Sequence, residues 1–185
     1  MSVRMQSSLF DIEAPSGAPL PERAAPTTFE SLHHTPIGLM RALTDRDSLL
    51  SLEFCPELGS GTPIIGPADP VGRNLGVQLG EYFAGTRQGF EIPLRLMGTP
   101  FQVRVWKALL AIPFGKTVCY SELAERLGVK NGQRAVGMAN RVNPVAVVVP
   151  CHRVVQADGQ LCGYAGGLWR KQHLLGLESG QRGLF

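Results

Sequence analysis

A run of five apolar residues, VAVVV at residues 145–149, lies between Pro144 and Pro150. A continuous apolar run of this length is typical of a strand that is buried on both faces. Cys151, His152 and Arg153 follow it directly. We therefore expect a buried strand that ends at a thiol, an imidazole and a guanidinium.

The chain has 185 residues and a hydrophobic content of 44%, enough for one compact domain or two small lobes. It has no apolar stretch near the roughly 20 residues that span a membrane, and its N-terminus lacks a basic segment leading into an apolar run. We expect a soluble, cytoplasmic monomer of mixed α/β (α+β) class with no membrane association.

The first half of the chain predicts a sheet followed by a helix. Residues 1–27 are rich in proline and polar residues and are expected to form a flexible tail. Residues 29–54 predict a small antiparallel sheet with turns at 35–38 and 45–47, and residues 56–70 a loop. Leu75, Leu79 and Tyr82 have helical spacing before Gly85, and residues 90–96 alternate like another strand. These elements define an N-terminal lobe over residues 28–97.

The second half predicts mostly helices. Thr99 can cap a helix that runs through Trp106 to a stop at Pro113 and Gly115. Ser121 can cap a short helix at 122–127, which Gly128 ends, and another helix is expected at 132–141. Two short helices joined by a tight turn indicate a helix-turn-helix. We expect this C-terminal domain to cover residues 98–180, with a tail at 181–185.

Charge is distributed unevenly. Residues 1–100 hold 7 Lys and Arg against 11 Asp and Glu, whereas residues 101–185 hold 11 against 4. Either the second half faces a polyanion such as DNA, or the surface is simply uneven. Small residues such as Ala135 on the second short helix allow close approach to DNA or to a neighbouring helix. Arg134 and Arg141 at its ends favour DNA, because a core accommodates their charge poorly.

The local chemistry makes Cys151 a candidate nucleophile. The four cysteines show no paired spacing for a disulfide framework or a zinc site, so we expect free thiols and no metal. His152 and Arg153 make the surroundings of Cys151 electropositive, which favours a thiolate. A water would relay the thiol proton to His152, and Glu178 is better placed than Asp158 to orient the imidazole. The alternative is a buried thiol beside a structural histidine.

The sequence PCHRV at residues 150–154 resembles the active-site signature of the O6-alkylguanine-DNA alkyltransferases, the methylated-DNA–protein-cysteine methyltransferase family. Other blocks resemble that family in order and spacing, and the resemblance extends from about Phe29 to Glu178. These blocks are FQVRVW at 101–106, YSELA at 120–124, RAVG at 134–137, Asn143-Pro144 and GYAGG at 163–167.

The resemblance implies a ribonuclease H-like N-terminal lobe and a role for each matching residue. Cys151 would be the alkyl acceptor, assisted by His152 and Glu178. The base pocket would be formed by Tyr120, Val154, Tyr164 and Ala165. Arg134 would enter the duplex in place of the flipped nucleotide. The DNA-binding surface would include Tyr120, Ser121, Arg134, Ala135, Asn140 and Arg141, and Asn143 would pin the turn before the nucleophile.

The function implied is repair of double-stranded DNA that contains O6-alkylguanine, with O4-alkylthymine as a further candidate, by irreversible transfer to Cys151 without a cofactor. DNA would be bound through the minor groove. Ala165 stands where many relatives have Ser, so a side-chain hydroxyl to O6 is absent and only a backbone N–H remains there. A lesion-binding protein without chemistry is the alternative, although such alkyltransferase-like relatives lack the cysteine. A Cys-His hydrolase would leave Arg134 and the helix-turn-helix unexplained.

Both ends of the chain carry the pattern Q-x-x-L-F, which resembles the peptide by which bacterial proteins dock on the sliding clamp. The residues concerned are Gln6, Leu9 and Phe10 near the start and Gln181, Leu184 and Phe185 at the end. Such peptides are usually found in disordered ends. The pattern is short, so coincidence is the alternative. Clamp binding would place the protein at the nucleoid.

Overall fold

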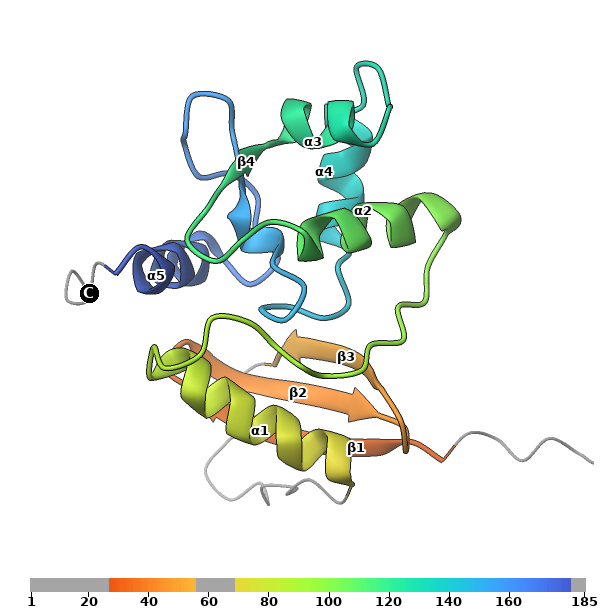
Figure 1. Cartoon of the computed structure of the whole chain (residues 1–185), viewed down its shortest axis with the longest axis vertical. Coiled ribbons are helices and arrows are strands. Elements are labelled where there is room, and N and C mark those ends of the chain that lie inside the picture. Colours follow the sequence, from red (N-terminus) through yellow and green to blue (C-terminus); the bar gives the residue numbers. More distant parts are fainter. Residues whose placement is uncertain (1–26, 56–68, 181–185) are drawn as a thin grey trace, which may run out of the picture.

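A computed structural model describes residues 27–55 and 69–180. Its elements form two groups, one below the other in Figure 1. We call β1–β3 with α1 the N-terminal lobe, and α2–α5 with β4 and β5 the C-terminal lobe. This arrangement confirms the expected mixed α/β fold. Within the described residues, no helix is both long enough and apolar enough to span a bilayer.

The N-terminal lobe contains the expected antiparallel sheet, in the order β1 (Phe29–Thr35), β2 (Gly38–Thr44) and β3 (Leu49–Phe54). Between β2 and β3, the Asp45 carboxylate accepts hydrogen bonds from the backbone N–H groups of Asp47 and Ser48, as expected of an aspartate at a turn. Helix α1 (Pro70–Phe83) begins at its N-cap Asp69, which accepts from Gly72. The helix packs against the sheet (Figure 1).

The predicted strand at residues 90–96 is wrong. Only an isolated parallel bridge between Leu94 and Leu49 forms there, with hydrogen bonds on either side of Leu94 from Leu49 N–H to Pro93 and from Arg95 N–H to Leu49. Pro93 has no N–H to donate and so interrupts any longer ladder. The alternating pattern therefore marks a segment that borders the sheet without extending it.

The C-terminal lobe begins with α2 (Pro100–Leu110), whose N-cap Thr99 exchanges hydrogen bonds with Gln102 in a capping box. Helices α3 (Tyr120–Arg126) and α4 (Gln133–Arg141) form the expected helix-turn-helix. The N-cap of α3 is Cys119 rather than Ser121, so the helix begins two residues earlier than predicted. Trp106 on α2 donates its indole N–H to the Ala139 carbonyl, which fixes α4 on α2.

The apolar run at residues 145–149 is buried as expected, but it is not a strand. Only Val145 pairs, through an isolated bridge to Leu52, and Val147 has a φ of 71° in the left-handed region. The Asn143 side-chain amide donates to the carbonyls of Val145 and Val149, which gives these groups a partner outside any ladder. A five-residue apolar pattern reports burial and cannot distinguish a strand from a buried turn.

Beyond this turn the chain forms a 3-10 helix, η1 (Cys151–Arg153), and a two-residue strand, β5 (Val154–Val155). Strand β5 pairs in parallel with β4 (Val118–Cys119), which directly precedes α3. This small sheet was not predicted, because two-residue strands carry no periodicity. It joins the segment after Cys151 to the start of the helix-turn-helix.

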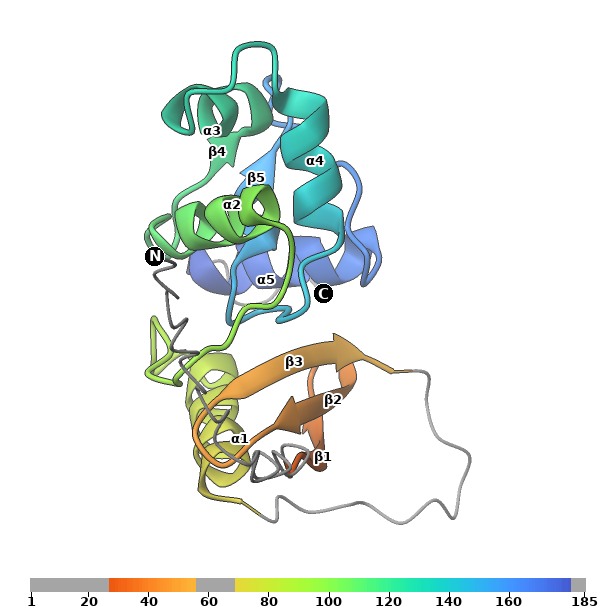
Figure 2. The ribbon, with the colours of Figure 1, turned by 90° about the vertical axis from the view of Figure 1, so that its right-hand side faces the viewer.

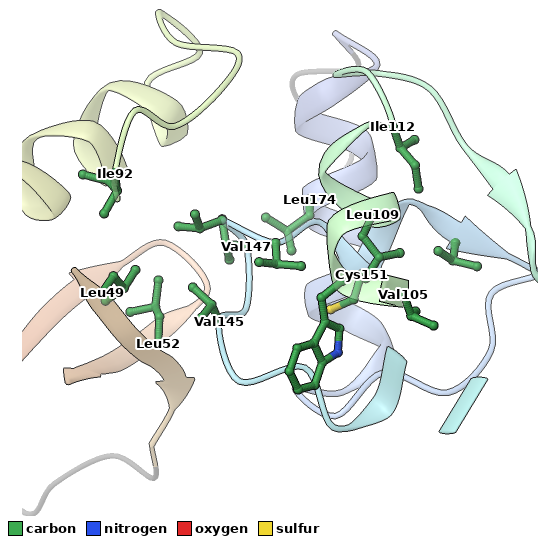
Figure 3. Close-up of a cluster of buried hydrophobic side chains, with 14 of the residues drawn as sticks. Leu49, Leu52, Ile92, Val105, Leu109, Ile112, Val145, Val147, Cys151 and Leu174 are labelled. Carbon is green, nitrogen blue, oxygen red and sulfur yellow. The ribbon is translucent and has the colours of Figure 1, made fainter. Parts of the chain in front are cut away.

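The buried turn lies between the two lobes. Figure 3 shows Val145 and Val147 facing Leu49 and Leu52, with Cys151 on the opposite side near Val105. Backbone hydrogen bonds from Leu52 N–H to Pro144 and from Ala146 N–H to Leu52, both of 2.8 Å, connect the lobes. The last helix, α5 (Leu168–Glu178), lies beside this junction (Figure 2). One continuous core thus supports the segment that carries Cys151.

Candidate active site

Cys151 is the first residue of η1 and is 5% exposed. Its thiol contacts the Asn143 side chain and the backbone N–H groups of Cys151 and His152, with the Lys171 ammonium nearby. Burial raises the pKa of the Cys151 thiol, whereas these contacts and the positive charge oppose the rise. The site therefore holds a thiol at neutral pH and supplies donors that stabilise the thiolate as it forms.

The Glu178 carboxylate, at the end of α5, is the centre of a buried hydrogen-bond network. It is 5% exposed and lies 2.8 Å from His152 Nε2, 2.6 Å from the Tyr82 hydroxyl and 3.1 Å from Gly115 N. The Arg153 guanidinium binds both of its oxygens, at 2.9 Å each. Burial alone would raise the pKa of Glu178, but the hydrogen bonds from His152 and Arg153 lower it to about 2. Glu178 is therefore an anion at any physiological pH.

The anionic Glu178 determines the tautomer of His152. A carboxylate can only accept, so Nε2 of His152 carries the proton and donates it to Glu178. The other ring nitrogen, Nδ1, is buried and has no hydrogen-bond partner among the described residues. Burial lowers the pKa of His152, and Glu178 only partly offsets this effect. The imidazole is thus neutral at pH 7, with Nδ1 available as a base.

Two buried side chains of this site, Tyr82 and Lys171, were not identified from the sequence, and Arg153 was expected only to make the surroundings of Cys151 electropositive. Arg153 also donates to the Ile112 carbonyl, at 2.6 Å. Tyr82 reaches Glu178 from α1, across 96 residues of sequence. Lys171, on α5, is fully buried and donates to the carbonyls of Val154 and Cys162, at 2.5 and 3.1 Å. For Lys171, the one available signal in the sequence was its place among leucines on the helix that follows GYAGG.

Of the proposed pocket residues, Tyr120 and Tyr164 lie close enough to Cys151 to respond to its charge: burial raises the pKa of both hydroxyls, and a Cys151 thiolate would raise it further. The Tyr164 hydroxyl is buried with no partner among the described residues, and its ring packs edge-on against Phe54. Val154 is fully buried in β5, whereas Ala165 is exposed in the following loop. The Gly166 carbonyl next to it accepts from Arg170, which also binds the Ile37 carbonyl of the N-terminal lobe.

Most of the expected DNA-binding residues lie on the surface of the helix-turn-helix. Ser121 on α3 and Arg134, Ala135 and Arg141 on α4 are exposed. Asn140 differs from this expectation. Its side chain is buried, with 4% exposed, because the last turn of α4 faces the Cys151 segment. The interpretation of Asn140 as a surface contact to DNA is therefore wrong.

The six residues of the two Q-x-x-L-F patterns, Gln6, Leu9, Phe10, Gln181, Leu184 and Phe185, lie outside the described residues. Asp158, the alternative partner for His152, is exposed and accepts a hydrogen bond from the backbone of Gln160. Within residues 27–55 and 69–180, no group of three His, Cys, Asp or Glu side chains is arranged to hold a metal ion.

Comparison with known proteins relates this arrangement to one family. The family profile described as "6-O-methylguanine DNA methyltransferase, DNA binding domain" matches residues 100–180. A methylated-DNA–protein-cysteine methyltransferase of Mycolicibacterium paratuberculosis is 58% identical over 101 residues, which are 55% of this chain and 61% of that protein. The chain thus spans about three fifths of this relative. A protein of the same name from Methanosarcina barkeri is 42% identical over 78% of this chain and 92% of its own length.

Solved structures extend the similarity to both lobes. The crystal structure of Mycobacterium tuberculosis O6-methylguanine methyltransferase has 39% sequence identity and a TM-score of 0.74, covering 86% of this chain and 97% of that one. The structure of M. tuberculosis OGT in complex with DNA has 41% identity and a TM-score of 0.74, over 82% and 93% of the two chains. On the identity and coverage of these relatives, the chain belongs to the methylated-DNA–protein-cysteine methyltransferase family.

Proposed function

We propose that this protein repairs DNA by moving the alkyl group of O6-alkylguanine onto Cys151. The observation that carries the proposal is the buried Cys151 thiol beside a neutral His152 whose Nε2 proton is held by Glu178. O4-alkylthymine is a second candidate substrate, because its alkyl carbon has the same chemistry. No cofactor is required, since the thiol itself accepts the group.

The transfer is a single displacement. Cys151 Sγ bonds to the alkyl carbon as the bond from that carbon to O6 breaks. The thiol proton passes through a bridging water to His152 Nδ1, and the guanine, which leaves as an anion, takes this proton back from the imidazolium. The product is a thioether, which water does not hydrolyse under ordinary conditions. Each protein molecule therefore acts once.

The stoichiometry of methyl transfer tests this function. Incubation with an excess of duplex DNA containing labelled O6-methylguanine should label the protein to one methyl group per chain and no further. Binding to the lesion without any label would select the alternative, an alkyltransferase-like protein that binds alkylated bases without chemistry. Release of product beyond one equivalent would indicate a turnover enzyme instead.

Duplex DNA should meet the exposed face of α3 and α4, where Arg134 and Arg141 provide positive charge and Ala135 allows close approach through the minor groove. We assign Arg134 to the space left by the flipped nucleotide, because a long cationic side chain can fill it and still reach phosphates. Asn143 keeps the role of holding the turn before Cys151.

Replacing Arg134 with alanine should slow transfer from duplex DNA by about 10- to 100-fold, since unstacking a base costs a few kcal/mol. Transfer from a short single-stranded oligonucleotide, which needs no extrusion, should change by less than about threefold. Single-turnover rates with the two substrates measure this difference. Arg41→Ala, at an exposed arginine of β2, is the control. Equal losses on both substrates would contradict a role in base flipping.

The transfer rate should remain constant as the pH falls from 8 to 6.5 and decrease only below that. Burial lowers the pKa of His152 below its ordinary value of 6.5, so the imidazole stays neutral to a lower pH than a free histidine. Glu178, with a pKa of about 2, does not titrate in this range. Transfer rates measured by rapid quench between pH 4.5 and 8 give the pH at which the rate has fallen by half. A half-maximal rate at a pH above 6.5 would show that the buried imidazole of His152 is not the base.

The terminal Q-x-x-L-F patterns support docking on the bacterial sliding clamp, which would place this monomeric, cytoplasmic protein at replicating DNA of the nucleoid. A Leu-Phe pair fills an apolar pocket and the Gln supplies hydrogen bonds. Immobilised clamp should retain the intact protein better than a variant with Phe10→Ala and Phe185→Ala. Equal retention of the two proteins would end this part of the proposal.

A further inference from the structure

Asn140 connects the helix-turn-helix to both sides of the site. Its amide nitrogen, near the end of α4, lies 3.5 Å from the Tyr120 hydroxyl oxygen and 3.3 Å from the carbonyl oxygen of Cys151. Only 4% of the residue is exposed. One side chain therefore spans the distance between the pocket tyrosine and the backbone of the nucleophile.

The chemistry of the two partners fixes the direction of these hydrogen bonds. The Cys151 carbonyl can only accept, so the NH₂ group of Asn140 faces it and donates. The same NH₂ group is the one that faces Tyr120, whose oxygen must therefore act as the acceptor. The Asn140 oxygen is buried and has no partner among the described residues, so it does not compete for the hydroxyl proton.

The proton of the Tyr120 hydroxyl is consequently left to donate elsewhere. The Cys162 thiol, a weak acceptor, is close enough to the hydroxyl to raise its pKa. A ring nitrogen of a purine is a stronger acceptor, so a base that enters the pocket can replace the sulfur. Burial, followed by the contact with Cys162, raises the pKa of Tyr120, and the hydroxyl stays protonated and able to donate.

We propose that Asn140 is a positioning residue for base recognition: its NH₂ group donates to the Tyr120 oxygen and turns the hydroxyl proton toward a ring nitrogen of the flipped purine. Its bond to the Cys151 carbonyl keeps this donor at a fixed place relative to the nucleophile. The inference rests on the proposed function, because it concerns the base that Cys151 dealkylates. It gives a buried residue of the helix-turn-helix a part in substrate selection.

The test compares O6-methylguanine with its 1-deaza, 3-deaza and 7-deaza analogues, in each of which one ring nitrogen is replaced by C–H. Single-turnover methyl transfer is measured in the same duplex for the wild type, Asn140→Leu, Tyr120→Phe and the double variant. Gln78→Leu is the matched control, since it removes another buried amide, in α1, that bonds the backbone of Glu91. Thermal melting reports whether each variant is folded.

In the wild type, one analogue should react about tenfold more slowly than the parent base, as expected for the loss of one hydrogen bond. Tyr120→Phe should abolish this penalty, Asn140→Leu should reduce it below about threefold, and Gln78→Leu should leave it unchanged. The double variant should be no slower than Tyr120→Phe, because Asn140 acts through the hydroxyl.

A full penalty in Asn140→Leu, additive losses in the double variant, or a wild type that is indifferent to all three nitrogens would each overturn the role of Asn140. These results differ from a failure of the proposed function itself. In that case the wild type would not take a methyl group from the parent base at all.

Discussion

Replacing Glu178 with glutamine should slow methyl transfer by about 10²- to 10⁴-fold, the range expected for loss of an oriented general base. A glutamine can present its NH₂ group to His152 Nε2, which would favour the opposite tautomer and place a proton on Nδ1. The same change leaves the buried guanidinium of Arg153 without its counter-charge. Breaking a buried pair in this way costs about 3–5 kcal/mol of the free energy of unfolding.

The stability of the Glu178 variant should also depend less on pH. The folded-state pKa of Glu178, about 2, is below its ordinary value of 4.5. Its contribution, about 3 kcal/mol by linkage, is therefore complete above pH 4.5 and is lost as the pH falls toward 2. Urea unfolding from pH 6 to pH 2.5 should show a flatter profile for Glu178→Gln than for the wild type.

Glu91→Gln makes the same chemical change at an exposed carboxylate of the N-terminal lobe and should leave both the rate and the stability unchanged. A Glu178→Gln protein that transfers methyl groups within about threefold of the wild-type rate would contradict the assignment of Glu178 as the group that orients His152.

Lys171→Met should raise the pKa of the Cys151 thiol and slow transfer at neutral pH. The Lys171 ammonium lowers that pKa by its charge, so its removal acts in the opposite direction and makes the thiol proton harder for His152 to remove. Methionine keeps the length of the side chain but leaves the Val154 and Cys162 carbonyls without their donor. We expect a loss of about 2–5 kcal/mol in stability for the two buried acceptors.

Alkylation of Cys151 by iodoacetamide as a function of pH, read at the Cys151 peptide by mass spectrometry, separates the charge effect from a general loss of stability. The midpoint should move to higher pH in Lys171→Met and stay in place in Lys107→Met, which removes an exposed lysine of α2. An unchanged or lower midpoint in Lys171→Met would show that Lys171 supports the backbone alone.

The parts of the fold that could be predicted are those decided by local chemistry. Thr99 and Pro100 define the start of α2 because capping depends on residues within one turn. The strand predictions at residues 90–96 and 145–149 failed because the pattern reports burial, whereas the partners of the backbone are set by Pro93 and Asn143. Asn140 was misplaced for a related reason, since position on a recognition helix does not say which way the last turn faces.

The residues of the candidate site also divide into those that the local sequence identifies and those that depend on how the two lobes pack. Cys151 and His152 could be selected because they are adjacent in the PCHRV sequence, and Glu178 because only two acids lie beyond them in the chain. The network that holds Glu178 could not, because Tyr82 belongs to the other lobe and its burial against α5 depends on how the lobes pack. Lys171 was missed because a lysine on a helix is ordinarily solvated, and only the structure shows its carbonyl partners.

The intact mass of the protein after incubation with duplex DNA containing O6-methylguanine tests the central claim most directly. The account predicts a gain of one methyl group, located on the Cys151 peptide, and no gain in Cys151→Ala, although the variant should still bind the DNA. An unmodified wild-type protein, or a methyl adduct that persists in Cys151→Ala, would contradict it.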